Sequence, residues 1–468
     1  MLKQLRIQNF KAWKDTGNIR MAPISLFFGA NSSGKSSIGQ FLMMLKQTIE
    51  SPDRKAVFYP GGKNSAVHLG SYQEMVFHRN PQNKIAFEYQ WTLPEDLKVK
   101  DPVSGQSYSG DELLFQAEVG LGDNDQHKLS IGQFQYKLLS DGHERLDIGL
   151  EKEPGRKSVF KAQSYKYKLV RQKGRAWSFR DTVRFYGFPD EMVAYYQNAD
   201  FVQWLNLAQE KLFQSVSYLG PLRTKAERLY SWSGIEPESV GYAGEYTVSA
   251  VLASKNRKLN LGYKRHNKSL EEIIALKLKQ MGLIEEFKVN PLSKERQEYE
   301  VKIQTKGSQG WVDLPDVGFG LSQVLPVLVQ CFYAAHDSII IMEQPEIHLH
   351  PKAQSALADV MIDAINSREN GSDRNIQLII ETHSEHFLRR LQRRIAEDVI
   401  PQEKVAAYFA NIDKTPAQLE PLQIDVFGNI LNWPENFFGD EMEDITEQSK
   451  AAMKKKMQQE PEQSGSSE

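Results

Sequence analysis

The sequence has few cysteines, no long apolar run and little net charge, and each of these absences excludes a class of protein. Its 468 residues include one cysteine, Cys331, so neither a disulfide framework nor a thiolate metal cluster can form within one chain. No apolar run approaches the roughly 18 residues that a membrane-spanning helix needs, and the start of the chain lacks an apolar core of secretory length. The 58 basic and 60 acidic residues nearly cancel, which excludes an overall attraction to nucleic acid. We expect a cytoplasmic protein with no membrane segment.

A glycine-rich loop near the start carries the clearest chemical signal. Gly29 to Ser36 fits the pattern of two glycines with four residues between them, followed by lysine and serine. In such a loop the backbone N–H groups surround phosphate oxygens, the lysine contacts the β- and γ-phosphates, and the hydroxyl ligates Mg²⁺. The predicted nucleotide-binding residues are Gly29, Ala30, Asn31, Ser32, Ser33, Gly34, Lys35, Ser36 and Ser37.

A second segment in the last third of the chain complements this loop. The apolar run Ile339 to Met342 ends in Glu343, Gln344, Pro345 and Glu346. Phosphate-loop folds hold their metal with a carboxylate at the end of such a strand. The two segments together indicate a nucleoside triphosphate with Mg²⁺.

The apolar periodicity predicts alternating strands and helices at both ends of the chain and hairpins between them. Strands are expected at 2–7 and 24–28, before a helix at 35–49. Short alternating runs broken by turn residues predict β-hairpins over 84–186. The remaining predicted elements are helices at 190–216, 270–284, 351–365 and 385–396, a helix ending near 335, a hairpin at 299–314, and strands at 338–342 and 377–381.

Four motifs in this order resemble the ABC-type ATPases of the SMC, RecF and OLD group. They are the phosphate loop, Glu343 to Pro351, Glu381 to Ser384, and Phe427 to Phe438, the last resembling a domain of unknown function that follows this ATPase core in many prokaryotic proteins. The middle of the chain matches weakly, with only Gly220-Pro-Leu-Arg standing out. The resemblance implies an α/β P-loop NTPase fold of ABC/SMC type, a mixed sheet flanked by helices, that binds ATP and Mg²⁺.

The resemblance also implies roles for three further residues. Ser322 corresponds to the signature serine that opens a helix and faces the γ-phosphate of ATP on a second subunit, although a plain glycine turn before a helix explains the same letters. His383 corresponds to the switch histidine near the γ-phosphate; a structural histidine is the alternative. Gln73 corresponds to the glutamine that joins the metal to the attacking water, with a weak alignment that leaves its role open.

One position departs from the family pattern. The strand normally ends in two acids, the first holding Mg²⁺ through water and the second polarising the attacking water, but here they are Glu343 and Gln344. Because an amide cannot accept a proton as a carboxylate does, hydrolysis should be slow or should recruit Glu346, Glu381 or His383. A slow ATPase stays long in its ATP-bound state, as suits a switch or clamp.

The length predicts several parts, because one hydrophobic core stops growing well below 468 residues. We expect an N-terminal ATPase lobe, an inserted β-rich and helical region, a C-terminal lobe with the signature, the metal-binding strand and the switch histidine, and a small C-terminal domain. The tail is charged and nearly free of large apolar residues, and is expected to be disordered. The predicted ranges are 1–83, 84–290, 291–400, 401–440 and 441–468.

A basic stretch with aromatic residues lies inside the predicted insertion. Between Lys152 and Arg184 there are eleven Lys or Arg and two acids, interleaved with aromatic residues as far as 186. Such a stretch could follow a phosphate backbone and stack bases. The alternative is a set of solvated hairpin faces whose aromatic side chains pack inward. The aromatic residues concerned are Phe160, Tyr165, Tyr167, Trp177 and Phe179.

These features favour an ATPase that acts as a switch. We expect a homodimer or higher oligomer formed through a composite ATP site, which controls a separate effector such as a nuclease in prokaryotic antiviral defence or DNA repair and maintenance. The alternatives are a DNA-binding clamp gated by ATP and a scaffold that binds ATP without hydrolysing it.

Overall fold

The computed structural model describes residues 1–468 apart from 123–124, 154–158, 175–177, 180–181, 263–264, 294–295, 306, 308–309, 413–415, 435–436, 438–440 and 460–468. The chain divides into one compact unit, Met1–Leu431, and a second unit, Asn432–Glu468. The predicted boundaries at residues 84, 291 and 401 lie inside the first unit.

A six-stranded sheet forms the centre of the first unit. Its strand order is β10-β17-β20-β4-β21-β22, parallel except for β22. Every residue of β4, β17 and β20 is buried, because helices cover both faces and the apolar runs of the sequence fill the interior. The bounds are β4 Ile24–Gly29, β10 Val216–Leu219, β17 Ile339–Glu343, β20 Gln377–Glu381, β21 Val405–Asn411 and β22 Gln418–Pro421. The C-terminal ends of β4, β20 and β17 therefore meet at one edge.

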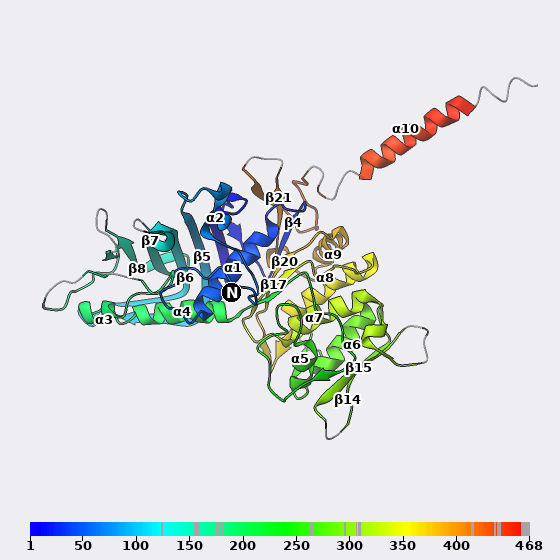
Figure 1. Ribbon diagram of the computed structural model, residues 1–468, viewed down its shortest axis with the longest axis horizontal. Helices are drawn as coiled ribbons and strands as arrows, with labels where there is room; N and C mark the ends of the chain where they lie inside the picture. The colour runs from blue at the N-terminus through cyan, green and yellow to red at the C-terminus, as the bar shows by residue number, and fades with distance from the viewer. Residues whose placement is uncertain are drawn as a thin grey trace, which may run out of the picture. The chain divides into compact units, whose positions relative to one another are not determined.

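Helices pack along this sheet as Figure 1 shows. The helix that follows the phosphate loop, α1, contacts four of its strands, and α7, α8 and α9 come from the last third of the chain. The helices of the core are α1 Lys35–Glu50, α4 Val202–Gln214, α7 Phe319–Tyr333, α8 Pro351–Ile365 and α9 Glu385–Ala396. The predicted α/β fold class, with a glycine loop between strand and helix, is confirmed.

The predicted hairpins form a long antiparallel sheet that continues from the N-terminal strand. The order is β2-β1-β5-β6-β7-β8-β9, with β3 beside β1. Aromatic contacts join this sheet to α1, since the Phe41 ring lies 5.1 Å from both Phe10 and Phe87. The strands are β1 Leu2–Phe10, β2 Trp13–Asp15, β3 Ile19–Arg20, β5 Ile85–Lys100, β6 Ser107–Gly122, β7 Asp125–Ser140, β8 His143–Lys152 and β9 Phe160–Gln163.

Shorter elements complete the first unit. Two small sheets, β11-β15-β14 with β16 and β13-β12-β18-β19, lie with α5 and α6 on the side of α7 seen at the lower right of Figure 1. Their bounds are β11 Tyr230–Ser231, β12 Lys258–Asn260, β13 Lys268–Ser269, β14 Glu286–Pro291, β15 Glu298–Gln304, β16 Val312–Asp313, β18 Arg368–Glu369, β19 Ser372–Asp373, α5 Thr247–Ala253 and α6 Leu270–Gln280. The remaining helices are α2 Tyr72–Met75 and α3 Glu191–Tyr195, with 3-10 turns at Phe77–Arg79, Leu314–Asp316 and Gln402–Lys404.

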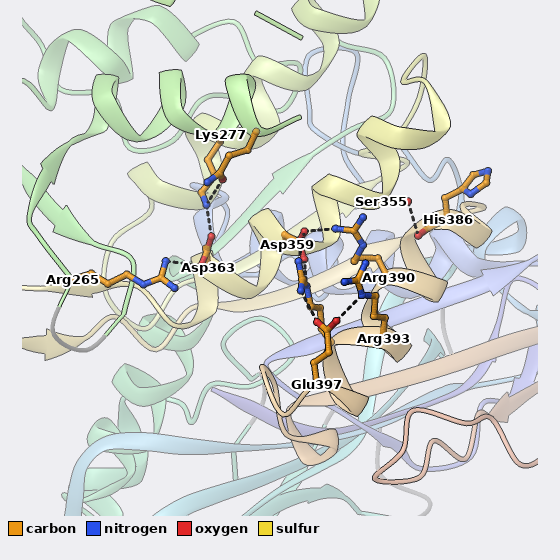
Figure 2. A network of polar contacts seen from close by, with 11 residues as sticks. Arg265, Lys277, Ser355, Asp359, Asp363, His386, Arg390, Arg393 and Glu397 are labelled. Atoms are coloured by element: carbon orange, nitrogen blue, oxygen red, sulfur yellow. Dashed lines mark hydrogen bonds and ion pairs between the residues drawn. The ribbon is translucent and has the colours of Figure 1, made fainter. Parts of the chain in front are cut away.

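Ion pairs anchor α8 to its neighbours on both sides, as Figure 2 shows. Asp359 of α8 accepts hydrogen bonds from Arg390 and Arg394 of α9. One turn further along α8, Asp363 pairs with Lys277 of α6. The arginine-rich face of α9 therefore serves to hold the helices against one another.

The second unit contains a helix where the composition predicted disorder. Its α10 spans Glu441–Gln459. This segment has no glycine or proline and is rich in Glu, Gln, Lys, Ala and Met, which have high helix propensity. Among the described residues, no helix is both long enough and apolar enough to cross a bilayer.

Candidate nucleotide site

The phosphate loop has the backbone shape that its glycines allow. Ser32 and Gly34 have φ values of 61° and 90°, and Gly29 has 142°. A Cβ on Gly29 would lie 2.7 Å from the Ala410 carbonyl oxygen, and one on Gly34 would lie 2.9 Å from the Ala12 Cβ. Both glycines are needed because the loop is pressed against neighbouring chain on its inner side. Its outer residues, 30–32, are exposed and face solvent.

Lys35 is buried beneath this loop. Its side chain is 4% exposed, and Nζ donates to the carbonyl oxygens of Gly29 and Ala30 at 2.9 and 2.7 Å. The Oε1 of Glu381 lies 4.0 Å away. Burial lowers the pKa of the Lys35 ammonium, and the charge of Glu381 opposes this shift. Lys35 thus places a cation directly under the loop, where an anion would bind.

Two carboxylates stand together at the strand ends. Glu343 ends β17 and Glu381 ends β20, and the two residues are register partners. Burial, with the charge of Glu381, raises the pKa of the Glu343 carboxyl to about 7, while a hydrogen bond from Tyr218 and the charge of Lys11 oppose the rise. Burial also raises the pKa of Glu381, against a hydrogen bond from Ser36 and the charge of Lys35.

This arrangement fits a magnesium-bound triphosphate. Among the described residues, Oε2 of Glu381 has no hydrogen-bond partner although it is buried, and burial raises the pKa of both carboxyls. Ser36 and Glu343 would hold Mg²⁺, and the loop backbone with Lys35 would hold the phosphates. Bound Mg²⁺ supplies positive charge that offsets the charge of the phosphate oxygens.

The backbone around Gln344 is held by hydrogen bonds to two neighbouring residues, Glu381 and Arg223. Its φ is 46°, and its N–H donates to the Glu381 carbonyl at 2.8 Å. Arg223 Nη2 lies 3.1 Å from the Glu343 carbonyl oxygen and 3.4 Å from that of Gln344. These contacts hold the backbone at position 344 in place.

Arg223 is itself buried, with 8% exposure. Burial lowers the pKa of its guanidinium to about 10, and the charge of Glu346 opposes the shift. Within the described part of the chain, its Nε and Nη1 have no hydrogen-bond partner. The segment Gly220-Pro-Leu-Arg, which stood out in the sequence, therefore supports the end of β17.

Glu346 connects the end of β17 to the predicted switch histidine. Its Oε1 accepts a hydrogen bond from the backbone N–H of His383 at 2.8 Å, and burial raises the pKa of its carboxyl. The His383 side chain is exposed, and partial desolvation, with the charge of Lys35, lowers the pKa of its imidazole. His383 thus lies near the phosphate loop in the same chain.

Ser322 lies apart from these residues. Helix α7 begins at Phe319, so it starts three residues before the position where the serine was expected to open it. The Ser322 hydroxyl donates to the Phe319 carbonyl at 2.8 Å, and in the described structure no hydrogen bond joins it to the phosphate loop. The start of α7 packs on the segment after β17, where the Phe319 and His348 rings are 4.8 Å apart.

Gln73 also lies outside the cluster. It is exposed on α2, and no hydrogen bond or ion pair of the described residues connects it with Ser36 or Glu343. Its proposed role in metal binding rests on the resemblance alone.

Two residues of the site were missed from the sequence. Tyr218 donates its hydroxyl to Glu343 Oε1 at 2.8 Å, and Trp13 donates Nε1 to the Gly34 carbonyl at 3.2 Å and to Ser37 Oγ at 2.9 Å. Both residues lie on strands outside the motifs that they contact. In the sequence alone, their surroundings are those of ordinary core residues. Only the strand pairing shows that they support the loop and the carboxylate.

The basic stretch shows mostly buried rings. Phe160, Tyr167 and Phe179 are 5%, 2% and 4% exposed, whereas Tyr165 is 85% exposed. Lys166 pairs with Glu144 at 3.8 Å. Trp177 and several of the basic residues, including Arg156 and Lys157, lie outside the described residues. The three buried rings fit the inward-packing interpretation of this stretch.

The fold and the site together are those expected of a P-loop NTPase, with a glycine loop between β4 and α1 and carboxylates at the ends of neighbouring parallel strands. Family matches agree with this class: residues 1–172 match the family described as "AAA ATPase domain", and residues 198–389 match "AAA domain, putative AbiEii toxin, Type IV TA system". Residues 400–448 match "Protein of unknown function (DUF3696)". The chain is thus similar to AAA ATPase domains over two stretches and to a family of unknown function after them. No curated protein matches it.

Solved structures similar to this chain include three SMC heads. The SMC head bound to the C-winged helix domain of ScpA has 10% identity and a TM-score of 0.42, covering 90% of this chain and 98% of that chain. The SMC head domain from Thermotoga maritima has 9% identity and a TM-score of 0.39, with coverage of 90% and 99%. The SMC head with an extended coiled coil, bound to the C-terminal domain of ScpA derived from Pyrococcus furiosus, has 9% identity and a TM-score of 0.42, with coverage of 90% and 96%.

Proposed function

We propose that this protein is an ATP-dependent switch that binds Mg²⁺-ATP, hydrolyses it slowly and closes two copies around the nucleotide. The observation that carries the proposal is the convergence of Lys35, Glu343 and Glu381 at one edge of the central sheet. Lys35 is buried under the loop, 4.0 Å from Glu381, which is the register partner of Glu343. A buried cation beneath a glycine loop and paired carboxylates beside it suit a magnesium-bound triphosphate.

Slow turnover follows from the side chain at position 344. Gln344 directly follows Glu343, at the position that corresponds to the second acid of the family, and its backbone is held by Glu381 and Arg223. An amide there can orient a water molecule but cannot take its proton. The ATP-bound state would then last long enough to act as a signal.

The second copy supplies what one chain lacks. Among the described residues, no hydrogen bond or ion pair joins Ser322 to the phosphate loop of its own chain, and Ser322 is partly exposed. In a head-to-tail pair, each α7 would face the partner's phosphate loop with its N-terminus and hydroxyl, which favour an anion. ATP would then lie between the two copies.

The switch would control a separate effector protein, such as a nuclease, in genome defence or DNA maintenance. Support comes from the family description over residues 198–389, which names a type IV toxin-antitoxin system. A DNA clamp gated by ATP has less support, because Phe160, Tyr167 and Phe179 are buried and unavailable for stacking on bases.

The mass of the protein in solution tests this proposal. With ATP and Mg²⁺, light scattering should show a dimer or higher oligomer for the wild type and a monomer for Lys35→Ala. Lys63→Ala removes an exposed lysine outside the loop and should behave as the wild type. The same mass for all three proteins with and without ATP would contradict the proposal.

A further inference from the structure

A cavity of about 840 Å³ lies beside the nucleotide site, with Tyr218 in its wall. It is bounded by the second half of α1, by β10, by the segment 238–246 and by the end of α7. The polar and aromatic side chains used below are Lys46, Glu50, Tyr59, Glu238, Tyr242, Glu245, Tyr246 and His336. The cavity belongs neither to the phosphate loop nor to the paired carboxylates.

The charges on the cavity wall are unbalanced. Lys46 is paired with Glu50 at 2.7 Å, and His336 with Glu369 at 3.3 Å. By contrast, neither Glu238 nor Glu245 has an ion-pair partner among the described residues, although Glu245 accepts a backbone hydrogen bond. The wall therefore presents two uncompensated carboxylates.

Three tyrosines line the same cavity as these carboxylates. Tyr59, Tyr242 and Tyr246 are 38%, 43% and 52% exposed. Exposed tyrosines beside free carboxylates suit a cation with an apolar stem, because the rings attract positive charge and the carboxylates accept charge-assisted hydrogen bonds. An arginine or lysine side chain has this chemistry, and tyrosine-rich surfaces are typical of protein interfaces.

Two sets of hydrogen bonds connect the cavity to the nucleotide site. Tyr218 lines the cavity with its ring and donates its hydroxyl to Glu343 at 2.8 Å. The segment that carries Tyr242 is bonded to the segment that carries Arg223, through Gly220 N–H to the Tyr242 carbonyl and Thr224 N–H to the Ala243 carbonyl, both at 2.8 Å. A displacement at the cavity would therefore reach both Glu343 and Arg223.

We propose that this cavity is a docking site for a basic segment of a partner protein, which places an arginine or lysine side chain between Glu238, Glu245 and the tyrosines. Docking shifts Tyr218 and so changes how Glu343 serves the nucleotide site. The proposed docking is argued from the cavity alone, whereas the effect on ATP turnover rests on the proposed ATPase function.

Binding is measured by fluorescence anisotropy on the full chain without nucleotide. The probe is a short fluorescein-labelled glycine-serine peptide with a central Arg-Arg pair, and its control carries Glu-Glu instead. The wild type should bind only the arginine peptide. Glu238→Gln with Glu245→Gln keeps the volume but removes the charge and should weaken binding about tenfold or more. Glu227→Gln, at an exposed glutamate that does not line the cavity, should leave binding unchanged.

Failure of the arginine peptide to bind, or equal affinity for the double variant, would overturn the docking site. These outcomes need no ATP, so they are separate from any failure of ATP binding. For the coupling, a saturating concentration of the peptide should change ATP turnover of the wild type at least twofold. Tyr218→Phe should still bind the peptide but lose this response. Unchanged wild-type turnover with peptide bound would overturn the coupling.

Discussion

Glu343 and Glu381 occupy paired positions at the ends of two adjacent parallel strands, and Lys35 lies 4.0 Å from Glu381. Lys35 thus lies beside Glu381, whereas the positive charge that acts on Glu343 is that of Lys11. The arrangement costs stability in the free protein, since charged groups are removed from water without full compensation. A divalent cation would relieve that cost, which supports the proposed magnesium site.

The raised pKa of Glu343 predicts how stability depends on pH. Its carboxyl titrates near 4.5 when unfolded and near 7 when folded, so the native state holds this proton to higher pH. The resulting stabilisation is complete below about pH 4.5 and is lost as the pH rises through about 7. Its size is on the order of 3 kcal/mol at most. In urea unfolding without metal, the free energy of unfolding of Glu343→Gln should fall less than that of the wild type as the pH rises over this range.

Glu227→Gln is the control for that measurement, because this glutamate is exposed. It should follow the wild-type pH profile. A Glu343→Gln profile parallel to that of the wild type would contradict the assignment of the raised pKa to Glu343.

Gln344→Glu tests the missing carboxylate. The substitution keeps the shape of the side chain, and the backbone contacts from Glu381 and Arg223 do not involve the altered group. A general base contributes about 10²- to 10⁴-fold to turnover, so the variant should hydrolyse ATP at least tenfold faster than the wild type in a phosphate-release assay. An unchanged rate would show that Glu346, Glu381 or His383 already serves as the base.

The same assay separates an ATPase from a scaffold. If the wild type hydrolyses ATP and Lys35→Ala does not, the scaffold hypothesis, in which ATP is only a structural ligand, is excluded. The comparison requires that Lys35→Ala remains folded, which circular dichroism checks.

Arg223→Met should slow turnover more than it weakens ATP binding. Arg223 contacts the carbonyl oxygens of Glu343 and Gln344, not the phosphate loop. Its loss leaves the loop after β17 less well held, and we expect about tenfold lower kcat with less than twofold change in ATP affinity. Arg228→Met, at an exposed arginine paired with Asp313 and Asp316, is the matched control. An equal loss of affinity and kcat in Arg223→Met would contradict a positioning role.

The sequence predicted those parts of the site that depend on local pattern. The phosphate loop between Ile24–Gly29 and Lys35–Glu50, and the apolar strands that end in Glu343 and Glu381, follow from periodicity over a few residues. The α/β class follows from the same alternation. The helix Glu441–Gln459 was missed because a polar composition argued for disorder, although its residues favour helix.

Long-range contacts could not be predicted in this way. Tyr218 and Arg223 reach Glu343 only because β10 pairs with β17, more than a hundred residues away in the chain. Likewise, the hairpins after residue 84 extend the sheet of the N-terminal strand β1, since Leu5 pairs with Tyr89. Pairing between distant strands leaves no mark in the local pattern of a single sequence.

Complementation between two inactive variants tests the central claim most directly. Lys35→Ala should lack ATPase activity because its own phosphate loop no longer binds ATP. Ser322→Arg should also lack activity, because the arginine on its α7 blocks the nucleotide bound by the partner. Mixed dimers of the two contain one intact site, made from the loop of one chain and the serine of the other. An equal mixture should therefore recover part of the wild-type turnover, whereas each variant alone has none. A mixture as inactive as its two components would contradict an ATP site shared between two copies.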